Sequence, residues 1–233
     1  MQRSLSVLIA LVLLFLTVGW SADFQKGYEA YMKEDYATAL RELKPLAKEG
    51  HQAAQFHLGF MYAKGKGVPQ NDKTAVKWYR LAAEQGDVLA QHNLGFMYAK
   101  GKGVPKNPKI AVKWFKLAAE QGYARAQGSL GWMYYYGKGV PQNDKTAAKW
   151  YRLAAGQGDI DAQNNLGLMY GLGRGVSKSD VYAYMWLNIA ALQGNKKAAG
   201  LRDILAKEMG SSQIEKAQDL ASDCVEKKFK ECD

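Results

Sequence analysis

The sequence has few of the residues from which metal centres and disulfide-rich cores are built. Its 233 residues include only 2 Cys and 3 His, too few for most metal clusters or for a small fold held by several disulfides. Its 24 Gly and 5 Pro follow no Gly-X-Y period, which excludes a collagen-like chain. Acids are also scarce, with 22 Asp and Glu against 32 Lys and Arg, a net charge of +10. A hydrophobic fraction of 48% nevertheless indicates a folded globular protein.

Catalytic motifs are missing as well. The sequence contains no Gly-x-Ser-x-Gly, His-Glu-x-x-His or Cys/His pair, so we expect no catalytic residue, no metal and no cofactor. The stretch from Gly59 to Gly67 differs from a phosphate-binding loop in its glycine spacing, and it has Gly where Ser or Thr would hold magnesium. His51, His57 and His92 have no carboxylate or Cys at ligand spacing. We interpret them as surface or rim residues.

The N-terminus has the form of an export signal. Arg3 precedes an uncharged, apolar run at 5–20, and the small residues Ser21 and Ala22 follow. This order is typical of a secretory signal peptide, which we place at 1–22. We expect cleavage near Ala22, a periplasmic or secreted mature protein, and no stable membrane insertion after cleavage. Cleavage after Ser21 and an uncleaved anchor are the alternatives, although the apolar run is short for a spanning helix.

A 36-residue period organises the rest of the chain. The pair Ala-Gln recurs at 54, 90, 126 and 162, and residues 54–89 match residues 90–125 at 26 of 36 positions. In each period Ala, Leu and Tyr follow at intervals of four residues, so they share one face of a predicted first helix. A Gly recurs directly after the Leu, as at Gly59. Because Gly weakens a helix, its recurrence indicates close backbone packing by a neighbour.

A second helix is predicted in each period. The segment Gly-Lys-Gly-Val-Pro ends the preceding helix in three of the four periods, and Ser177 replaces Pro in the fourth, where we expect a looser loop. The second helix starts near Asn71 and Asp72, where Asx side chains can cap free N–H groups. A Gln-Gly turn closes each period. We expect the buried face of this helix to comprise Ala75, Trp78, Leu81 and Ala82 and their equivalents.

The motifs Ala-x-x-x-Leu-Gly-x-Met-Tyr, Gly-x-Gly-Val-Pro, Ala-x-x-Trp-Tyr and Ala-Ala-x-Gln-Gly together resemble the Sel1-like repeat, a relative of the tetratricopeptide repeat. The resemblance implies an all-α fold, an α/α superhelical solenoid of stacked helical hairpins behind the signal peptide. Ser212 and Glu215 fit a capping box before the closing helix. We expect an N-terminal helical hairpin cap at 23–53, four repeats at 54–89, 90–125, 126–161 and 162–197, and a C-terminal helical cap at 198–233.

The resemblance also implies function, that of a non-enzymatic protein–protein interaction scaffold of the bacterial cell envelope. In related solenoids the first helices line a concave surface. Tyr135 and Tyr136 replace the Ala-Lys of the two earlier repeats and are the expected hot spot for a protein or peptide partner. The alternative is that the column formed by Phe60, Phe96, Trp132 and Leu168 on the first helices packs against the adjacent repeat. The expected partner-binding residues are Phe60, Phe96, Trp132, Tyr135, Tyr136 and Leu168.

Nine cations occupy equivalent places on three second helices, and we call them the basic stripe. An ordinary solvated face is one interpretation, and capture of an acidic partner or an anionic envelope polymer is the other. Nucleic acid is disfavoured, because the chain is expected to be exported and no aromatic residues alternate with the stripe. The stripe comprises Lys73, Lys77, Arg80, Lys109, Lys113, Lys116, Lys145, Lys149 and Arg152.

The two cysteines, Cys224 and Cys232, flank a Lys-rich segment at the C-terminus. In an oxidising compartment we expect them to form a disulfide, with two free thiols as the alternative. A Cys-rich branch of Sel1-like proteins has been linked to penicillin binding and hydrolysis, so a cell-wall enzyme is a further alternative function. The repeats of this sequence contain no Cys, which argues against that activity.

Overall fold

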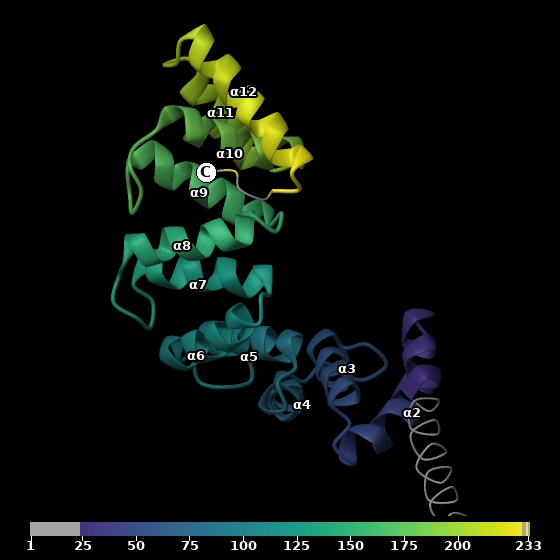
Figure 1. Ribbon diagram of the computed structural model, residues 1–233. Coiled ribbons are helices and arrows are strands. Elements are labelled where there is room, and N and C mark those ends of the chain that lie inside the picture. Colours follow the sequence, from purple (N-terminus) through teal and green to yellow (C-terminus); the bar gives the residue numbers. More distant parts are fainter. Residues whose placement is uncertain (1–23, 230–231, 233) are drawn as a thin grey trace, which may run out of the picture. The chain divides into compact units, whose positions relative to one another are not determined.

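The computed structural model describes residues 24–229 and residue 232, which form helices and connecting turns without any strand. The chain divides into two compact units, Met1–Lys106 and Asn107–Asp233, called unit 1 and unit 2 below. The predicted signal peptide at 1–22 lies outside the described residues. Within each unit, consecutive helices pack as antiparallel hairpins in chain order (Figure 1). The all-α fold of stacked hairpins is thus confirmed.

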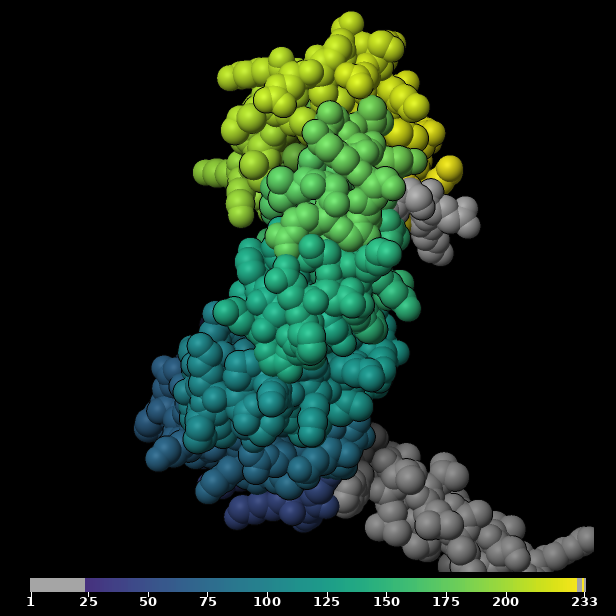
Figure 2. All heavy atoms as spheres, turned by 90° about the vertical axis from the view of Figure 1, so that its left-hand side faces the viewer, coloured from purple at the N-terminus to yellow at the C-terminus, as the bar shows by residue number. Residues whose placement is uncertain are grey.

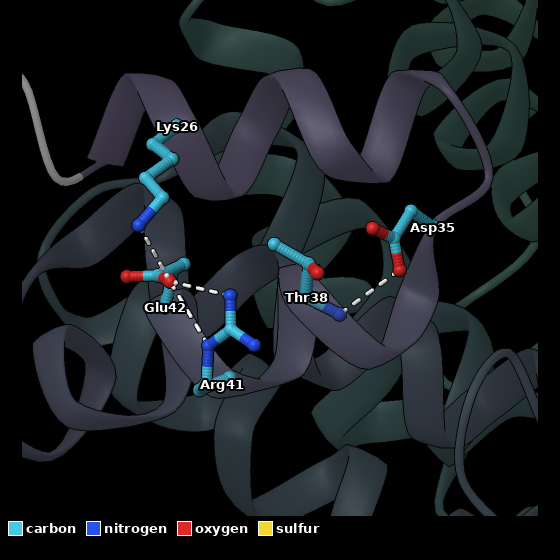
Figure 3. Close-up of polar contacts among 5 residues, drawn as sticks. All are labelled: Lys26, Asp35, Thr38, Arg41 and Glu42. Atoms are coloured by element: carbon cyan, nitrogen blue, oxygen red, sulfur yellow. Dashed lines mark hydrogen bonds and ion pairs between the residues drawn. The ribbon is translucent and has the colours of Figure 1, made fainter.

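Unit 1 begins with helical residues 24–32, which pair with the first full helix. The helices that follow are α2 (Tyr36–Lys48), α3 (Gln52–Lys64), α4 (Asp72–Glu84) and α5 (Val88–Lys100). Lys26 and Arg41 both contact the carboxylate of Glu42 at 3.0 Å, and Asp35 caps α2 by accepting from the N–H of Thr38 (Figure 3). The hydrogen bonds from Lys26 and Arg41 hold the pKa of Glu42 below its usual range.

Unit 2 contains the second helix of the second repeat, the two complete hairpins of the third and fourth repeats, and two closing helices. Its helices are α6 (Pro108–Glu120), α7 (Ala124–Tyr136), α8 (Asp144–Ala155), α9 (Ile160–Leu172), α10 (Asp180–Leu192), α11 (Lys196–Ala206) and α12 (Ser211–Glu226). Each helix from α6 to α10 packs against the next one. On the face shown in Figure 2, the atoms of unit 2 form a continuous surface, coloured from teal to yellow along the sequence. Stacking therefore supplies the core that one hairpin lacks.

The signals for helix starts and stops operate as the sequence indicates. Asn71 caps α4 by accepting from the N–H of Thr74 at 2.9 Å, and Asn143 caps α8 in the same way at 2.8 Å. Gly65 follows α3 in the left-handed conformation, at φ +67°, and its N–H bonds the carbonyl of Met61. A residue with a Cβ is strained at such a φ, so glycine ends the helix there.

The buried face of the second helices differs from the expected one. Ala75 and Ala82 are buried as expected, but Trp78 is half-buried and Leu81 is exposed. The core position belongs instead to Tyr79, which the sequence-based assignment left out. The same correction applies to α8, where Tyr151 is buried, Trp150 is half-buried and Leu153 is exposed.

The recurring glycine of the first helix explains this arrangement. A Cβ added at Gly59 would lie 2.6 Å from Cδ1 of Tyr79, and one at Gly131 would lie 2.9 Å from Cδ1 of Tyr151. The glycine therefore creates the space into which the aromatic ring of the second helix packs, since interiors leave no room for an added methyl group. The prediction of close packing at these glycines is confirmed.

The C-terminal cap covers one face of α10. α12 packs against α10, and its buried residues are Ala217, Ala221 and Cys224 (Figure 1). The helix starts at Ser211 rather than after Ser212, so the predicted capping box is out of register. In its place Oε1 of Gln213 accepts from the N–H of Gly210 at 3.1 Å.

The tail after α12 folds back onto the turn between α8 and α9. Cys224 and Cys232 form a disulfide, and Lys228 and Phe229 have positive φ angles of 53° and 63°. A Cβ added at Gly156 would lie 3.2 Å from the carbonyl oxygen of Phe229. Gly156 stands where the two earlier repeats have Glu. The third repeat therefore has a smaller residue at the place where the tail rests.

Candidate functional site

An exposed aromatic cluster lies on α7. Trp132 and Tyr136 are 43% and 53% exposed, and their ring centroids are 4.9 Å apart. The ring of Tyr135 lies edge-on to Tyr136 at 4.9 Å and is half-buried. Exposed aromatic side chains in mutual contact offer a large, rigid surface to a partner. The structure thus brings together three of the predicted partner-binding residues.

Arg174 fixes this cluster from the fourth loop. Its guanidinium lies 4.0 Å above the ring centroid of Tyr135 and makes two hydrogen bonds of 2.9 Å to the carboxylate of Asp144. The hydrogen bonds from Arg174 hold the pKa of Asp144 below its usual range. The fork of an Arg side chain suits such a paired contact. The expectation of a looser fourth loop does not match these contacts.

The corresponding positions in unit 1 combine aromatic rings with lysines. Phe60 is half-buried and its ring lies edge-on to that of Tyr31 at 6.2 Å, whereas Phe96 is exposed. Lys64 and Lys100 place their ammonium groups 6.0 Å from the centroids of these two rings. Tyr136 occupies the place of these lysines in α7. The cluster in unit 2 is therefore more apolar than its counterparts in unit 1.

Sequence analysis missed two members of the apolar column in unit 2. Leu168 of α9 is half-buried, while Leu172 and Ile204 are exposed. Leu172 follows Tyr136 by one 36-residue period, and Ile204 follows Leu168 by one. Applying the same spacing to Tyr136 within the fourth repeat would have found Leu172, and extending it from Leu168 beyond that repeat would have found Ile204. We call Trp132, Tyr136, Leu168, Leu172 and Ile204 the apolar column.

The basic stripe is solvated, but its members differ in their contacts. Arg80 donates to the hydroxyl of Tyr98 at 2.8 Å, and Lys116 pairs with Glu120 at 3.6 Å. Arg152 donates to the hydroxyl of Tyr170 at 2.9 Å. In unit 1 the stripe also continues into the cap, because Arg41 and Lys44 precede Lys77 and Arg80 by 36 residues and are exposed.

The remaining six lysines of the stripe have no ion pair within the described residues. All six are exposed, and they stand at the first two stripe positions of α4, α6 and α8. These lysines are Lys73, Lys77, Lys109, Lys113, Lys145 and Lys149.

His57 lies inside an aromatic cluster of unit 1 rather than at the surface. Its ring centroid is 5.0 Å from that of Tyr31 and 5.2 Å from those of Tyr28 and Phe56. Its Nδ1 is enclosed and has no hydrogen-bond partner among the described residues. Burial lowers the pKa of this imidazole to about 4. The position of His57 corrects its interpretation as a surface or rim residue.

His51, another of the histidines interpreted as surface or rim residues, has a structural role. The imidazole of His51 caps α3 by accepting from the N–H of Ala54 at 3.2 Å. Nowhere in the described part of the chain do three His, Cys, Asp or Glu side chains gather in a way that would hold a metal ion. Among the same residues, no helix combines the length and apolar character that crossing a membrane requires.

Stacked helical hairpins with an exposed apolar column define a helical-repeat protein whose surfaces are suited to binding. The Sel1 repeat family model matches residues 52–87, 88–123, 124–159 and 160–195, so the chain belongs to the Sel1 repeat family. This family has a protein-interaction repeat fold. The resemblance to Sel1-like repeats is therefore confirmed, with each matched repeat beginning two residues before the predicted one.

Solved structures of bacterial Sel1 proteins are similar to this chain. A Sel1 repeat protein from Oxalobacter formigenes is 39% identical, with a TM-score of 0.72, over 77% of this chain and 74% of that one. The c5321 protein, a protective antigen of uropathogenic Escherichia coli strains with the SLR fold, is 35% identical, with a TM-score of 0.78. That match covers 89% of this chain and 46% of the antigen, so the chain spans about half of its length. No curated protein matches the sequence significantly.

Proposed function

We propose that the protein is a non-enzymatic protein–protein interaction scaffold of the bacterial cell envelope, periplasmic or secreted. The observation that carries this proposal is the aromatic cluster of α7, in which Trp132 and Tyr136 are exposed while Tyr135 is held by Arg174. A rigid, solvent-facing aromatic surface loses little conformational entropy on binding. Phe60, Phe96 and Leu168 occupy the same column in the other repeats and extend the proposed site within their own units.

The proposed location rests on two features. The order of charged, apolar and small residues at 1–22 is that of a secretory signal. The disulfide between Cys224 and Cys232 is of a kind that persists outside the reducing cytosol. Mass determination of the protein recovered from a periplasmic extract tests the location. We expect a mature chain that starts at or next to Asp23, and a full-length chain in the cytosolic fraction would contradict the proposal.

Partner capture tests the proposed interaction. The mature protein is immobilised and exposed to a periplasmic extract, and bound proteins are identified by mass spectrometry. We expect a defined partner whose recovery falls at least about tenfold when Trp132 and Tyr136 are both replaced with Ala, as for hot-spot residues. Leu192→Ala serves as a control, because Leu192 is 73% exposed on α10 outside the apolar column. Equal recovery with all three proteins would refute the aromatic site.

Binding of an anionic envelope polymer is a second candidate function. It is favoured by the six exposed lysines of the basic stripe that have no ion pair among the described residues. Such binding should weaken steeply with salt, because the attraction is screened. A cell-wall enzyme like the Cys-rich branch is the third alternative. A β-lactam hydrolysis assay of the mature protein tests this alternative. Hydrolysis that a point substitution abolishes would decide in its favour.

A further inference from the structure

The first helices of unit 1 and their loops carry lysines but no acid. Residues 52–71 and 88–106, which comprise α3, α5 and the loops that follow them, contain five lysines and neither Asp nor Glu. Two of these lysines, Lys64 and Lys100, are the last residues of α3 and α5, and both are exposed. A surface whose charges have one sign attracts a partner of the opposite sign. These segments therefore favour a partner with carboxylates.

Each of the two lysines stands beside an aromatic ring one helical turn earlier. The ammonium groups of Lys64 and Lys100 lie 6.0 Å from the ring centroids of Phe60 and Phe96. Phe60 is half-buried, and Phe96 is 42% exposed. We call these four residues the Phe-Lys face. A carboxylate that pairs with either lysine would lie next to an apolar surface, so the face suits an acidic side chain followed by an apolar one.

Asn93 adds a group that can bind a peptide backbone. It lies one turn before Phe96 in α5, is half-buried, and makes no hydrogen bond to another described residue. Its side-chain amide has both donors and an acceptor. The backbone groups of a helix are already bonded to one another, whereas an extended segment has free N–H and C=O groups. Asn93 therefore favours an extended partner over a helical one.

The spacing of the two lysines fits such a segment. α3 and α5 both pack against α4 and touch each other, so their equivalent residues are separated by about one interhelical distance, roughly 10 Å. A polyproline-II segment advances about 9 Å in each turn of about three residues, and every third side chain points the same way. Carboxylates three residues apart would therefore reach Lys64 and Lys100. Lys66, in the loop after α3, already lies 3.9 Å from a carboxylate oxygen of Glu34.

Unit 2 lacks this combination. Tyr136 and Leu172 occupy the positions of Lys64 and Lys100 in the third and fourth repeats. The corresponding face of unit 2 is thus apolar and offers no ammonium group there. The preference for acidic side chains belongs to unit 1.

We propose that the Phe-Lys face binds an extended acidic segment of a partner protein, in which a carboxylate recurs at every third residue beside an apolar side chain. This proposal rests on the proposed scaffold function and names the kind of partner that unit 1 accepts. Lys64 and Lys100 pair with the carboxylates. Phe60 and Phe96 contact the apolar side chains, and Asn93 bonds the backbone between them.

A peptide titration tests the proposal. The probe is a fluorescent peptide of consecutive Glu-Phe-Pro triplets, because Pro favours the polyproline-II conformation. The reference peptide has the same composition, with Glu, Phe and Pro in separate blocks. We expect the mature, disulfide-closed protein to bind the probe at least about fivefold more tightly than the reference. The Kd of the probe should rise about tenfold with Lys64→Glu and Lys100→Glu together, about fivefold with Phe96→Ala, and about threefold with Asn93→Ala.

Matched variants separate the Phe-Lys face from general charge and general exposure. Lys48→Glu with Lys216→Glu reverses one exposed lysine of α2 and one of α12, outside both the face and the basic stripe. Leu81→Ala removes an apolar side chain of α4 that is 44% exposed, about as much as Phe96. Both variants should leave the Kd within about twofold. An equal loss with the α2 and α12 variant would assign the binding to net charge and overturn the proposal.

Poly-L-glutamate distinguishes a patterned segment from a plain polyanion. If it binds as tightly per charge as the probe, and Phe96→Ala binds both ligands normally, the face recognises a polyanion and the proposal is wrong. The proposed scaffold function fails separately, when partner recovery is unaffected by the changes at Trp132 and Tyr136. If those changes lower recovery while the variant at Lys64 and Lys100 binds the probe normally, the scaffold function stands and the acidic segment is refuted.

Discussion

Gln157 donates a hydrogen bond from Nε2 to Oε1 of Gln127 at 2.7 Å, and Gln127 in turn donates to the carbonyl of Ala119 at 3.2 Å. Gln127 belongs to the recurring Ala-Gln pair and Gln157 to the Gln-Gly turn of the same repeat. A buried amide thus ties three consecutive helices, α6, α7 and α8. Gln193 and Gln163 are paired in the same way in the fourth repeat, at 2.8 Å. Both motifs recur because they are partners.

Replacing Gln127 with Leu should destabilise unit 2. The change removes the hydrogen bonds that join Gln127 to the carbonyl of Ala119 and to the amide of Gln157, each of which contributes about 0.5–1.5 kcal/mol. Urea denaturation followed by circular dichroism measures the loss. Gln142→Leu is the control, because Gln142 is exposed and its one side-chain hydrogen bond among the described residues is a 3.4 Å contact to Asp144. Equal midpoints for the two variants would contradict a structural role of the glutamine pair.

Acid should destabilise unit 1 through His57. The pKa of this imidazole is lowered from 6.5 to about 4 by burial, so the folded protein binds fewer protons than the unfolded chain between these values. No stability is lost through His57 above about pH 6.5, and the loss grows as the pH falls, reaching roughly 3 kcal/mol near pH 4. Denaturation series between pH 7 and pH 4 measure it.

A His57→Phe variant is the comparison for this series. Phe fits an aromatic surrounding and does not titrate, so the difference in stability between wild type and variant should change with pH while other groups cancel. The carboxyls of Asp87 and Asp159, whose pKa values are raised by burial, are among those that cancel. A difference that stays constant from pH 7 to pH 4 would show that His57 is hydrated in the folded protein.

Gly131→Ala should be destabilising although Ala is the better helix former. The new Cβ would lie 2.9 Å from Cδ1 of Tyr151, a ring that is buried in the core and cannot move aside. Overpacking of this kind costs about 1–3 kcal/mol, against a gain in helix propensity of about 1 kcal/mol. Gly200→Ala in α11 is the control, since nothing lies within 4 Å of its added Cβ. The control should gain stability, and a gain at both sites would refute the packing argument.

Opening the disulfide should release the tail from Gly156. Replacing both cysteines with Ser is expected to lower the free energy of unfolding by roughly 2–3 kcal/mol, chiefly because the unfolded chain loses a constraint. Gly156→Ala adds a Cβ that would lie 3.2 Å from the carbonyl oxygen of Phe229. It should destabilise the closed form more than the double-Ser form. A double-mutant cycle measures this difference, and strict additivity would mean that the tail does not rest on Gly156.

The buried face of the second helices could not be predicted from the hydrophobic pattern of the sequence. Between Ala75 and Ala83, apolar residues occur at seven of nine positions and surround more than half of the helix. Periodicity therefore favoured a face with Trp78 and Leu81, whereas the core holds Val76, Tyr79 and Ala83. Only the space above Gly59, which belongs to another helix, selects Tyr79. A local pattern cannot contain that information, because the space is formed by the neighbour.

The end of the basic stripe is a feature that is visible in the sequence but whose cause is not. The change from Lys149 to Met185 is visible in the sequence, but its reason is the position of α12 over α10. Likewise Gly156 differs from its equivalents Glu84 and Glu120 because the tail rests there. In each case a departure from the repeat marks a contact from outside the repeat. Such departures are the sequence signal to examine first.

The sequence by itself determined the repeated helical hairpins and the residues that start and end most of their helices. These follow from the 36-residue period and from residues such as Asn71 and Gly65, whose effects act within a few bonds along the chain. Tertiary structure decided which side of each helix is covered, which lysines remain open and where Phe229 rests. Those outcomes depend on groups far apart in sequence that compete for the same surface, and burial is decided only when the helices meet.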